Sequence, residues 1–157
     1  MTPEDLANLE RLLVGQRLVA LGLVVNGEPV VGLLPNAVAA DRSAIYVHAS
    51  RLARHSEGLQ PGARWSGAIH EPDSPETDPL QVARLVLEGS VTPLLGGSPE
   101  LESGIGTFLS RFPGAAMTLS LPDFTLYRLS LEGGRMILGF GRALNLSASH
   151  FGLLAKG

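Results

Sequence analysis

The sequence contains no cysteine among its 157 residues. This absence excludes disulfide-linked scaffolds, thiolate metal sites, iron–sulfur clusters and a cysteine nucleophile. Aromatic residues make up 5% of the chain and charged residues 17%, less than the charged share of about a quarter that is usual in globular proteins. Because 45% of the residues are hydrophobic, the chain is nevertheless expected to fold, and its length suits one domain with a real core.

Long apolar runs are also missing. The longest, Leu18–Val25, is far too short to cross a bilayer. Glu4, Asp5 and Glu10 occupy the segment where a signal peptide needs a basic start. We therefore expect a cytoplasmic protein that does not associate with membranes. The net charge of −3 argues against a protein that binds nucleic acid through overall positive charge.

Lysine is nearly absent, since Lys156 is the only lysine and the other 11 basic residues are arginines. Codon usage in a GC-rich genome is one explanation. The other is that some arginines bind planar or phosphate anions, for which the rigid guanidinium fork is suited. The candidate anion-binding residues are Arg51, Arg54 and Arg84, with Arg142 as a weaker candidate. They are chosen because they are expected at a strand–helix junction or on strands.

Glycine and proline are abundant, with 19 and 11 residues, which favours many short elements over long helices. A helix is predicted over residues 2–14, with Thr2 as its N-cap. A hairpin is predicted over 16–40, because the Asn-Gly pair at 26–27 between apolar runs is a strong turn signal. Both faces of the run Leu18–Val25 are apolar. We expect the barrel interior to cover one face, and a helix or a second subunit to cover the other.

Five further strands and two further helices are predicted from alternation and punctuation. The strands cover residues 43–49, 63–70, 82–94, 124–131 and 135–146, and the helices cover residues 50–59 and 98–112. Residues 71–79 are expected to form an acidic surface loop, and the tail 147–157 has no strong pattern. Seven strands joined mostly by short turns predict an antiparallel α+β or barrel-like domain.

No motif for catalysis by protein side chains is found. There is no G-x-S-x-G elbow and no Walker A loop, and the four histidines have no metal-ligand spacing. We therefore assign no catalytic residue and no metal ligand.

The segment Ser50–His55 carries the clearest binding chemistry. It lies where a strand is expected to run into a short helix. The amides of a helix N-terminus, the Ser50 hydroxyl and the cations Arg51 and Arg54 would form an anion pocket there, with His55 on the face of Arg51. The alternative is a capped surface helix with ordinary exposed arginines.

Two strand features also have alternative interpretations. Arg84 either makes an edge strand soluble or points across a barrel mouth toward the same anion. Gly139, Gly141 and Ala143 fall on one face of the last strand, where either a flat ligand approaches closely or the strand bends.

Seven segments occur in an order that is fairly specific for one fold. They are GEPVVGLLPN at 27–36, SRLARH at 50–55, LQPGAR at 59–64, DPLQVARLVLEG at 78–89, RFPGA at 111–115, DFTLYRL at 123–129 and GFGRA at 139–143. With them the chain, over roughly residues 12–147, resembles the pyridoxamine-phosphate-oxidase-like, FMN-binding split-barrel superfamily. Within that superfamily it is most similar to the heme-utilisation (heme oxygenase-like) branch.

The resemblance implies one split-barrel domain of six to seven strands with short flanking helices, forming a homodimer with FMN or another ligand at the interface. The domain would cover residues 1–157, with a helix in 1–15, the barrel in 16–146 and a tail in 147–157. By position, the cofactor-binding residues are Ser50, Arg51 and His55 at the flavin phosphate, Arg84 beside the cofactor, and Leu33 and Asn36 along the isoalloxazine ring. Arg54 and Arg142 are added as neighbouring cations.

The sequence also departs from the family pattern. Gly32 stands where relatives often have Ser or Arg, and Asn36 stands where many have an aromatic residue. Heme-degrading relatives use a histidine in a C-terminal extension, for which only His150 is available here.

Three functions follow from the resemblance and the residues. The first is an FMN-dependent oxidoreductase acting on a small molecule, in which the flavin supplies the redox chemistry. The second is binding or degradation of heme on the same fold. The third is a non-enzymatic dimeric module with a decayed flavin site.

Overall fold

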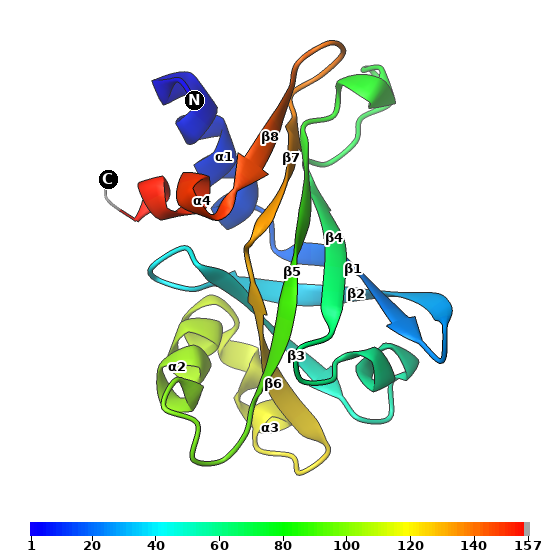
Figure 1. Ribbon diagram of the computed structural model, residues 1–157, viewed down its shortest axis with the longest axis vertical. Helices are drawn as coiled ribbons and strands as arrows, with labels where there is room; N and C mark the ends of the chain where they lie inside the picture. Colours follow the sequence, from blue (N-terminus) through cyan, green and yellow to red (C-terminus); the bar gives the residue numbers. More distant parts are fainter. Residues whose placement is uncertain (156–157) are drawn as a thin grey trace.

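The Asn26-Gly27 turn brings the first two strands together, as predicted. Asn26 has a φ of 51° and Gly27 a φ of 78°, which are the left-handed values that a two-residue hairpin turn requires. The turn joins β1 (Leu18–Val25) to β2 (Glu28–Val38). In the computed structural model, which describes residues 1–155, this hairpin forms one wall of a closed antiparallel barrel (Figure 1).

Six strands close the barrel in the order β4–β1–β2–β3–β6–β5, and β5 pairs back to β4. The remaining strands are β3 (Ala44–Ser50), β4 (Arg64–His70), β5 (Arg84–Leu94), β6 (Phe124–Ser130), β7 (Gly133–Ile137) and β8 (Ala143–Ser147). β7 and β8 extend the sheet from the edge of β5. The predicted class, an antiparallel α+β split barrel, is confirmed.

β5 belongs to both halves of the barrel. Its first half pairs with β4 and β7, whereas Val91–Leu94 pair with β6. At the change of partner, a Cβ on Gly89 would overlap the backbone carbonyl of Ser130. Glu132 also connects β5 to β6 at this point, because its Oε1 accepts hydrogen bonds from the hydroxyls of Ser90 and Ser130. An ion pair with Arg64 and these bonds lower the pKa of Glu132 to about 2.

Short helices cover the barrel unevenly (Figure 1). They are α1 (Pro3–Gly15), α2 (Leu101–Arg111), α3 (Ala116–Leu119) and α4 (Ala148–Leu154), with 3-10 turns η1 (Arg54–Gly58), η2 (Pro79–Gln81) and η3 (Pro113–Ala115). α1 contributes Leu9, Leu12 and Leu13 to the main core, together with Phe151 of α4. α2 packs Phe108 in a second cluster outside β3 and β6. None of the helices within residues 1–155 is long and apolar enough to span a membrane.

Two predicted elements are wrong, and one helix was not predicted. Residues 50–59 form a turn and η1 instead of a helix, since β3 continues to Ser50 and the chain then turns tightly. The single strand over 135–146 is a β7–β8 hairpin, because Gly139 and Gly141, with φ of 124° and 79°, reverse the chain. The tail contains α4, which starts with a capping box between Ser147 and His150. Its last two residues, 156–157 with Lys156, lie outside the described part.

The expectation that both faces of the hairpin are covered is met on one side. Val19, Leu21 and Leu23 of β1 are buried in the main core. On the outer face, Val24 is 63% exposed and Leu18 is 49% exposed. No helix of residues 1–155 lies over this outer face.

The contact at Gly89 predicts a strong effect of one methyl group. Gly89→Ala forces β5 away from Ser130 and is expected to lower the free energy of unfolding by about 2–3 kcal/mol, measured by denaturant unfolding. The matched change Gly106→Ala, in open space on α2, is expected to raise it by about 0.5–1 kcal/mol. Equal stability of the two variants would contradict the close contact between β5 and β6 at Gly89.

Candidate functional site

The Ser50–His55 segment is a turn that follows β3. The Ser50 hydroxyl donates to Asp123 Oδ2 at 3.2 Å and accepts the Leu52 N–H at 3.1 Å. The carboxylate of Asp123 is negative, so it would repel a phosphate bound at the Ser50 hydroxyl. Only the side chains of Arg51 and Arg54, both of which are exposed, could attract an anion to this segment.

His55 of the same segment packs on the backbone of β2. A Cβ on Gly32 would lie 2.7 Å from His55 Nδ1, so the missing side chain at 32 is the space that the imidazole occupies. Burial lowers the pKa of His55, which keeps the ring neutral at pH 7. In this position His55 brings no charge to an anion.

Arg51 opens onto a hollow of about 430 Å³ between η1 and the ends of β5 and β6. Its Nη2 donates to the Pro122 carbonyl at 3.0 Å. Thr125 and Tyr127 line the same hollow, and burial raises the pKa of Tyr127, so its phenol stays protonated. The guanidinium and the hydroxyls suit a small oxyanion, but the carboxylate of Glu57 lines the same hollow and opposes one, and Arg54 is not among the lining residues.

Leu33 and Asn36 lie on opposite faces of β2. Leu33 is 66% exposed on the outside, whereas Asn36 is fully buried on the side of Leu34 and Val38, which belong to the main core. Neither the Oδ1 nor the Nδ2 atom of Asn36 has a hydrogen-bond partner within residues 1–155. The two residues therefore do not face one common ligand.

Arg84 and Arg142 line a different hollow, of about 450 Å³, together with Arg135 and the exposed Phe140. Arg84 Nη1 donates to the Val82 carbonyl at 3.0 Å. Arg135 was not among the predicted site residues, because the β7–β8 hairpin that brings it here was missed. The eight predicted site residues are thus distributed over separate places rather than joined in one pocket.

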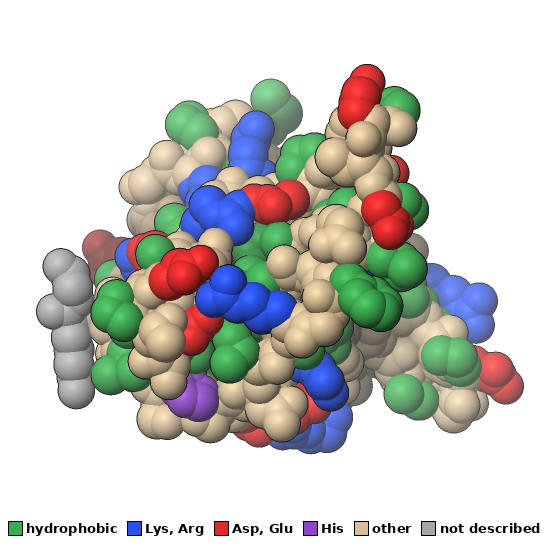
Figure 2. Space-filling view, turned by 90° about the horizontal axis from the view of Figure 1, so that it is seen from above, with side chains coloured by type: hydrophobic (Ala, Val, Ile, Leu, Met, Phe, Trp, Pro, Cys, Tyr) green, Lys and Arg blue, Asp and Glu red, His purple; other side chains and the backbone are tan. Residues whose placement is uncertain are grey.

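Arg142 is already engaged by acids of α1. Its Nη2 donates to Asp5 Oδ1 at 2.9 Å and its Nη1 to Glu4 Oε1 at 3.2 Å. Basic and acidic side chains likewise lie side by side on the face seen in Figure 2. The positive charge of Arg142 is therefore already paired with the carboxylates of Glu4 and Asp5 in α1.

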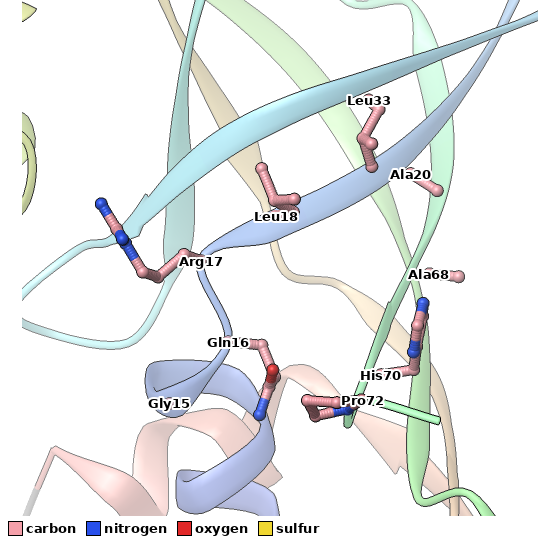
Figure 3. A pocket seen from close by; sticks show the side chains of 9 residues that line it. All are labelled: Gly15, Gln16, Arg17, Leu18, Ala20, Leu33, Ala68, His70 and Pro72. Atoms are coloured by element: carbon pink, nitrogen blue, oxygen red, sulfur yellow. The ribbon is translucent and has the colours of Figure 1, made fainter. Parts of the chain in front are cut away.

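The outer face of β1, β2 and β4 carries a further hollow, to which sequence analysis assigned no ligand. The small residues Ala20, Gly22 and Ala68 lie in register on β1 and β4, and Leu33 pairs with Ala20 across to β2. A hollow of about 380 Å³ lies at the end of this face where α1 meets β1. Figure 3 shows the Leu18 and Leu33 side chains between Arg17 and the imidazole of His70, which stand at opposite ends.

Arg17 and His70 were not among the predicted site residues. The guanidinium of Arg17 lies 5.0 Å from the centre of the Phe112 ring. His70 is the last residue of β4 and is exposed. Within residues 1–155, no group of three or more acidic or histidine side chains converges in the manner of a metal site.

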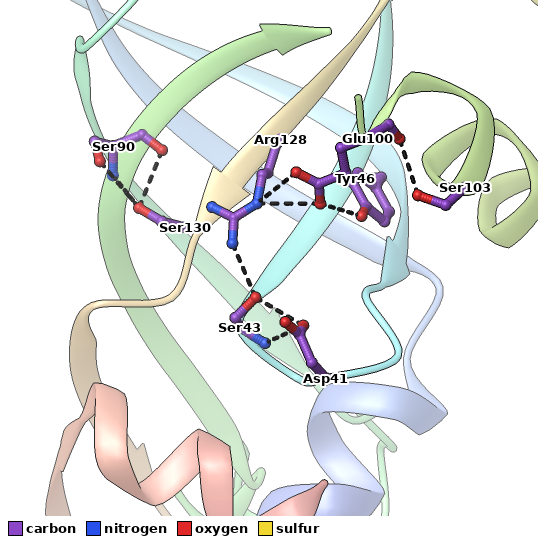
Figure 4. A network of polar contacts seen from close by, with 8 residues as sticks. All are labelled: Asp41, Ser43, Tyr46, Ser90, Glu100, Ser103, Arg128 and Ser130. Atoms are coloured by element: carbon purple, nitrogen blue, oxygen red, sulfur yellow. Dashed lines mark hydrogen bonds and ion pairs between the residues drawn. The ribbon is translucent and has the colours of Figure 1, made fainter. Parts of the chain in front are cut away.

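A polar network on the other side of the barrel connects α2 to the sheet (Figure 4). Glu100 accepts hydrogen bonds from the Tyr46 hydroxyl and from Arg128, which also donates to the Ser43 hydroxyl at 2.8 Å. Ser43 in turn donates to Asp41 at 2.7 Å. Because the members satisfy one another, we interpret this network as structural.

Comparison with known proteins confirms the split-barrel fold. No family model matches the chain, and the curated proteins contain no significant match. A heme-binding protein from Mycobacterium smegmatis has a TM-score of 0.83 at 23% identity, covering 98% of this chain and 62% of its own length. This chain therefore spans less than two thirds of that protein.

Two further solved structures share the fold. A pyridoxinephosphate oxidase family protein from Clostridium acetobutylicum has a TM-score of 0.69 at 14% identity, covering 96% of this chain and 99% of its own. An FAD-binding protein from Mesorhizobium loti has a TM-score of 0.61 at 14% identity, covering 84% and 91%. The fold is thus common to heme-binding and flavin-binding proteins.

Burial of two histidines predicts a pH dependence. Burial lowers the pKa of His48, which packs between Phe108 and Phe124, and burial also lowers the pKa of His55. The unfolded chain binds these protons near its ordinary pKa of 6.5, before the folded chain does. Stability is therefore full above that pH and is expected to fall as the pH drops through the lowered values. The melting temperature, measured from pH 8 to pH 5, should show this fall. In the His48→Gln/His55→Gln double variant the melting temperature should depend less on pH. An unchanged slope in that variant would contradict it.

Proposed function

We propose that this chain binds a flat, anionic cofactor on the outer face of β1, β2 and β4, with heme as the first candidate. The observation that carries the proposal is the floor formed by Ala20, Gly22 and Ala68, flanked by exposed Leu18 and Leu33. Small residues on adjacent strands leave a smooth apolar surface, which suits one face of a planar macrocycle. Apolar surface this continuous is uncommon on a protein that leaves it open to water.

The polar groups at the rim of this floor fit heme. His70 offers an imidazole, the commonest protein ligand of heme iron. Arg84 lies directly opposite His70 in the β4–β5 register and offers a guanidinium to a propionate. Bound heme would supply the iron and its redox chemistry, while the chain's own residues bind it and exclude water from one face. The heme-binding protein that shares this fold supports the proposal.

Flavin is the second candidate, on a different observation. Arg84, Arg135 and Arg142 line one hollow with Phe140, whose side chain is 83% exposed. Guanidinium groups suit a flavin phosphate, and an exposed aromatic ring suits stacking on an isoalloxazine. In that case the protein would act as a flavin-dependent oxidoreductase on a small molecule, without a catalytic side chain of its own. The FAD-binding protein of the same fold supports this alternative.

A second copy of the chain is the proposed cover for the floor. The sheet can shield only one side of a planar cofactor, whereas ligand sites bury most of the ligand surface. Val31 and Leu33 of β2 are 71% and 66% exposed on the same face, and Val31 lies beyond the residues that line the 380 Å³ hollow, so one cofactor there would leave it exposed. A two-fold dimer through this face would bury both residues and enclose the ligand.

Cofactor choice is tested by titrating the purified full chain with hemin, FMN and FAD in turn. We expect a saturable Soret band with hemin, at about one heme per chain. The free energy of unfolding should also rise, by about 2.7 kcal/mol when the free ligand concentration reaches a hundred times Kd. Quenched flavin fluorescence without a Soret band would favour the second candidate. Absence of saturable binding for all three would contradict both.

The proposed dimer is tested by placing a charged side chain in its interface. Val31→Glu buries an unpaired carboxylate in each copy and is expected to weaken the dimer at least a hundredfold, measured by sedimentation equilibrium. Met117→Glu is the matched control, because Met117 is 76% exposed on α3, away from this face. A wild-type monomer at high concentration, or equal dissociation of the two variants, would contradict the proposal.

A further inference from the structure

We infer that His70, at the end of β4, would hold the heme iron through its Nε2 atom. This inference rests on the proposed function, which concerns the class of cofactor, and adds which atom holds the iron. It differs from the expectation drawn from the family resemblance, in which the histidine near the C-terminus, His150, is the candidate.

The backbone sets the tautomer of His70. Its Nδ1 lies 2.6 Å from the carbonyl oxygen of Glu71. A carbonyl oxygen can only accept a hydrogen bond, so Nδ1 carries the ring proton. Nε2 of the neutral ring then has a free lone pair, and it makes no hydrogen bond to any residue in 1–155. This arrangement, with one ring nitrogen donating to a carbonyl, is the usual outer-shell support of a metal-binding histidine.

The carbonyl that fixes His70 is itself held in place. The Glu71 N–H donates to the Ala83 carbonyl at 3.0 Å, which extends the β4–β5 pairing by one residue. The Glu71 carboxylate forms an ion pair with Arg11 of α1. His70 therefore stands on a strand end that is anchored to both β5 and α1, and its ring is held rather than free to rotate.

Two of the other three histidines are packed inside. The ring of His48 lies between Phe108 and Phe124, and that of His55 lies over Gly32. In both, Nε2 is buried without a hydrogen-bond partner among the described residues. A planar macrocycle has no access to either nitrogen without displacing the surrounding elements.

His150 presents the opposite tautomer. The Ser147 N–H donates to His150 Nδ1 at 3.0 Å in the capping box that starts α4. Nδ1 is therefore the acceptor, and the proton of the neutral ring lies on Nε2. Binding iron through either nitrogen would require a change of tautomer or loss of the cap. Of the four histidines, His70 alone is accessible with an unprotonated Nε2.

The surroundings of His70 complete the site. The 380 Å³ hollow is lined by His70 together with Ala68, Ala20 and Leu33, so the imidazole stands beside the apolar floor (Figure 3). Arg84 is its neighbour on β5, directly opposite in register. An imidazole, a smooth apolar surface and a guanidinium are thus present on four adjacent strands, β2, β1, β4 and β5.

The test compares two identical substitutions, His70→Gln and His150→Gln, during hemin titration of the full chain. Glutamine keeps a polar side chain, and in His150→Gln it can still accept the cap hydrogen bond. We expect His70→Gln to lower hemin affinity at least tenfold and to shift the Soret maximum away from the wild-type position. His150→Gln should match wild type in both. Circular dichroism checks that the variants are folded.

Rescue separates ligation from a structural effect. In His70→Gly, added imidazole should restore the wild-type Soret maximum and the low-temperature electron paramagnetic resonance signature of the ferric heme. Wild-type spectra in both His70 variants, or loss of the band in His150→Gln alone, would overturn the inference and leave heme binding standing. Absence of any Soret band with wild-type protein would overturn the proposed function as well.

Discussion

The barrel depends on one strand, β5, whose residues must pair on two edges and still let the backbone of β6 approach. The space comes from glycine, because any Cβ at Gly89 would overlap the carbonyl of Ser130. Gly134 plays the same part where β7 joins, since its φ is 150° and a Cβ there would overlap the Val86 carbonyl. The register of β5 against β4 places Arg84 directly opposite His70.

The helices then decide which outer surfaces stay open. α2 and α3 cover β3 and β6, while α1 and α4 pack together beside the upper part of the sheet in Figure 1. α2 also covers the end of β2, where Ala37 is buried, whereas Leu18 and Val24 of β1 and Val31 and Leu33 of β2 stay exposed on the outside. The same strands carry small residues on that face, so the open surface is both apolar and smooth. Closure of the barrel and the unequal placement of the helices leave this face open, and this is the basis for the proposal that it binds a cofactor.

Local sequence signals predicted much of the fold, and their failures have physical reasons. The Thr2 cap and the Asn26-Gly27 turn were found because each acts within a few residues. The β7–β8 hairpin was missed because Gly139 and Gly141 were interpreted as part of a smooth strand. The candidate site was harder, since it depends on contacts between strands. His70 is a lone histidine at a strand end, and the contact that supports its proposed role as a ligand is to a backbone carbonyl, which no side-chain pattern reveals.

Hydrogen exchange measured by mass spectrometry, on the protein with and without hemin, tests the account most directly because it locates the bound cofactor. We expect hemin to slow exchange in β1, in β4 up to His70 and Glu71, and in the facing part of β2, with little change elsewhere. Protection confined to α4 around His150, or to the turn from Ser50 to His55, would contradict a site on the outer face of the barrel.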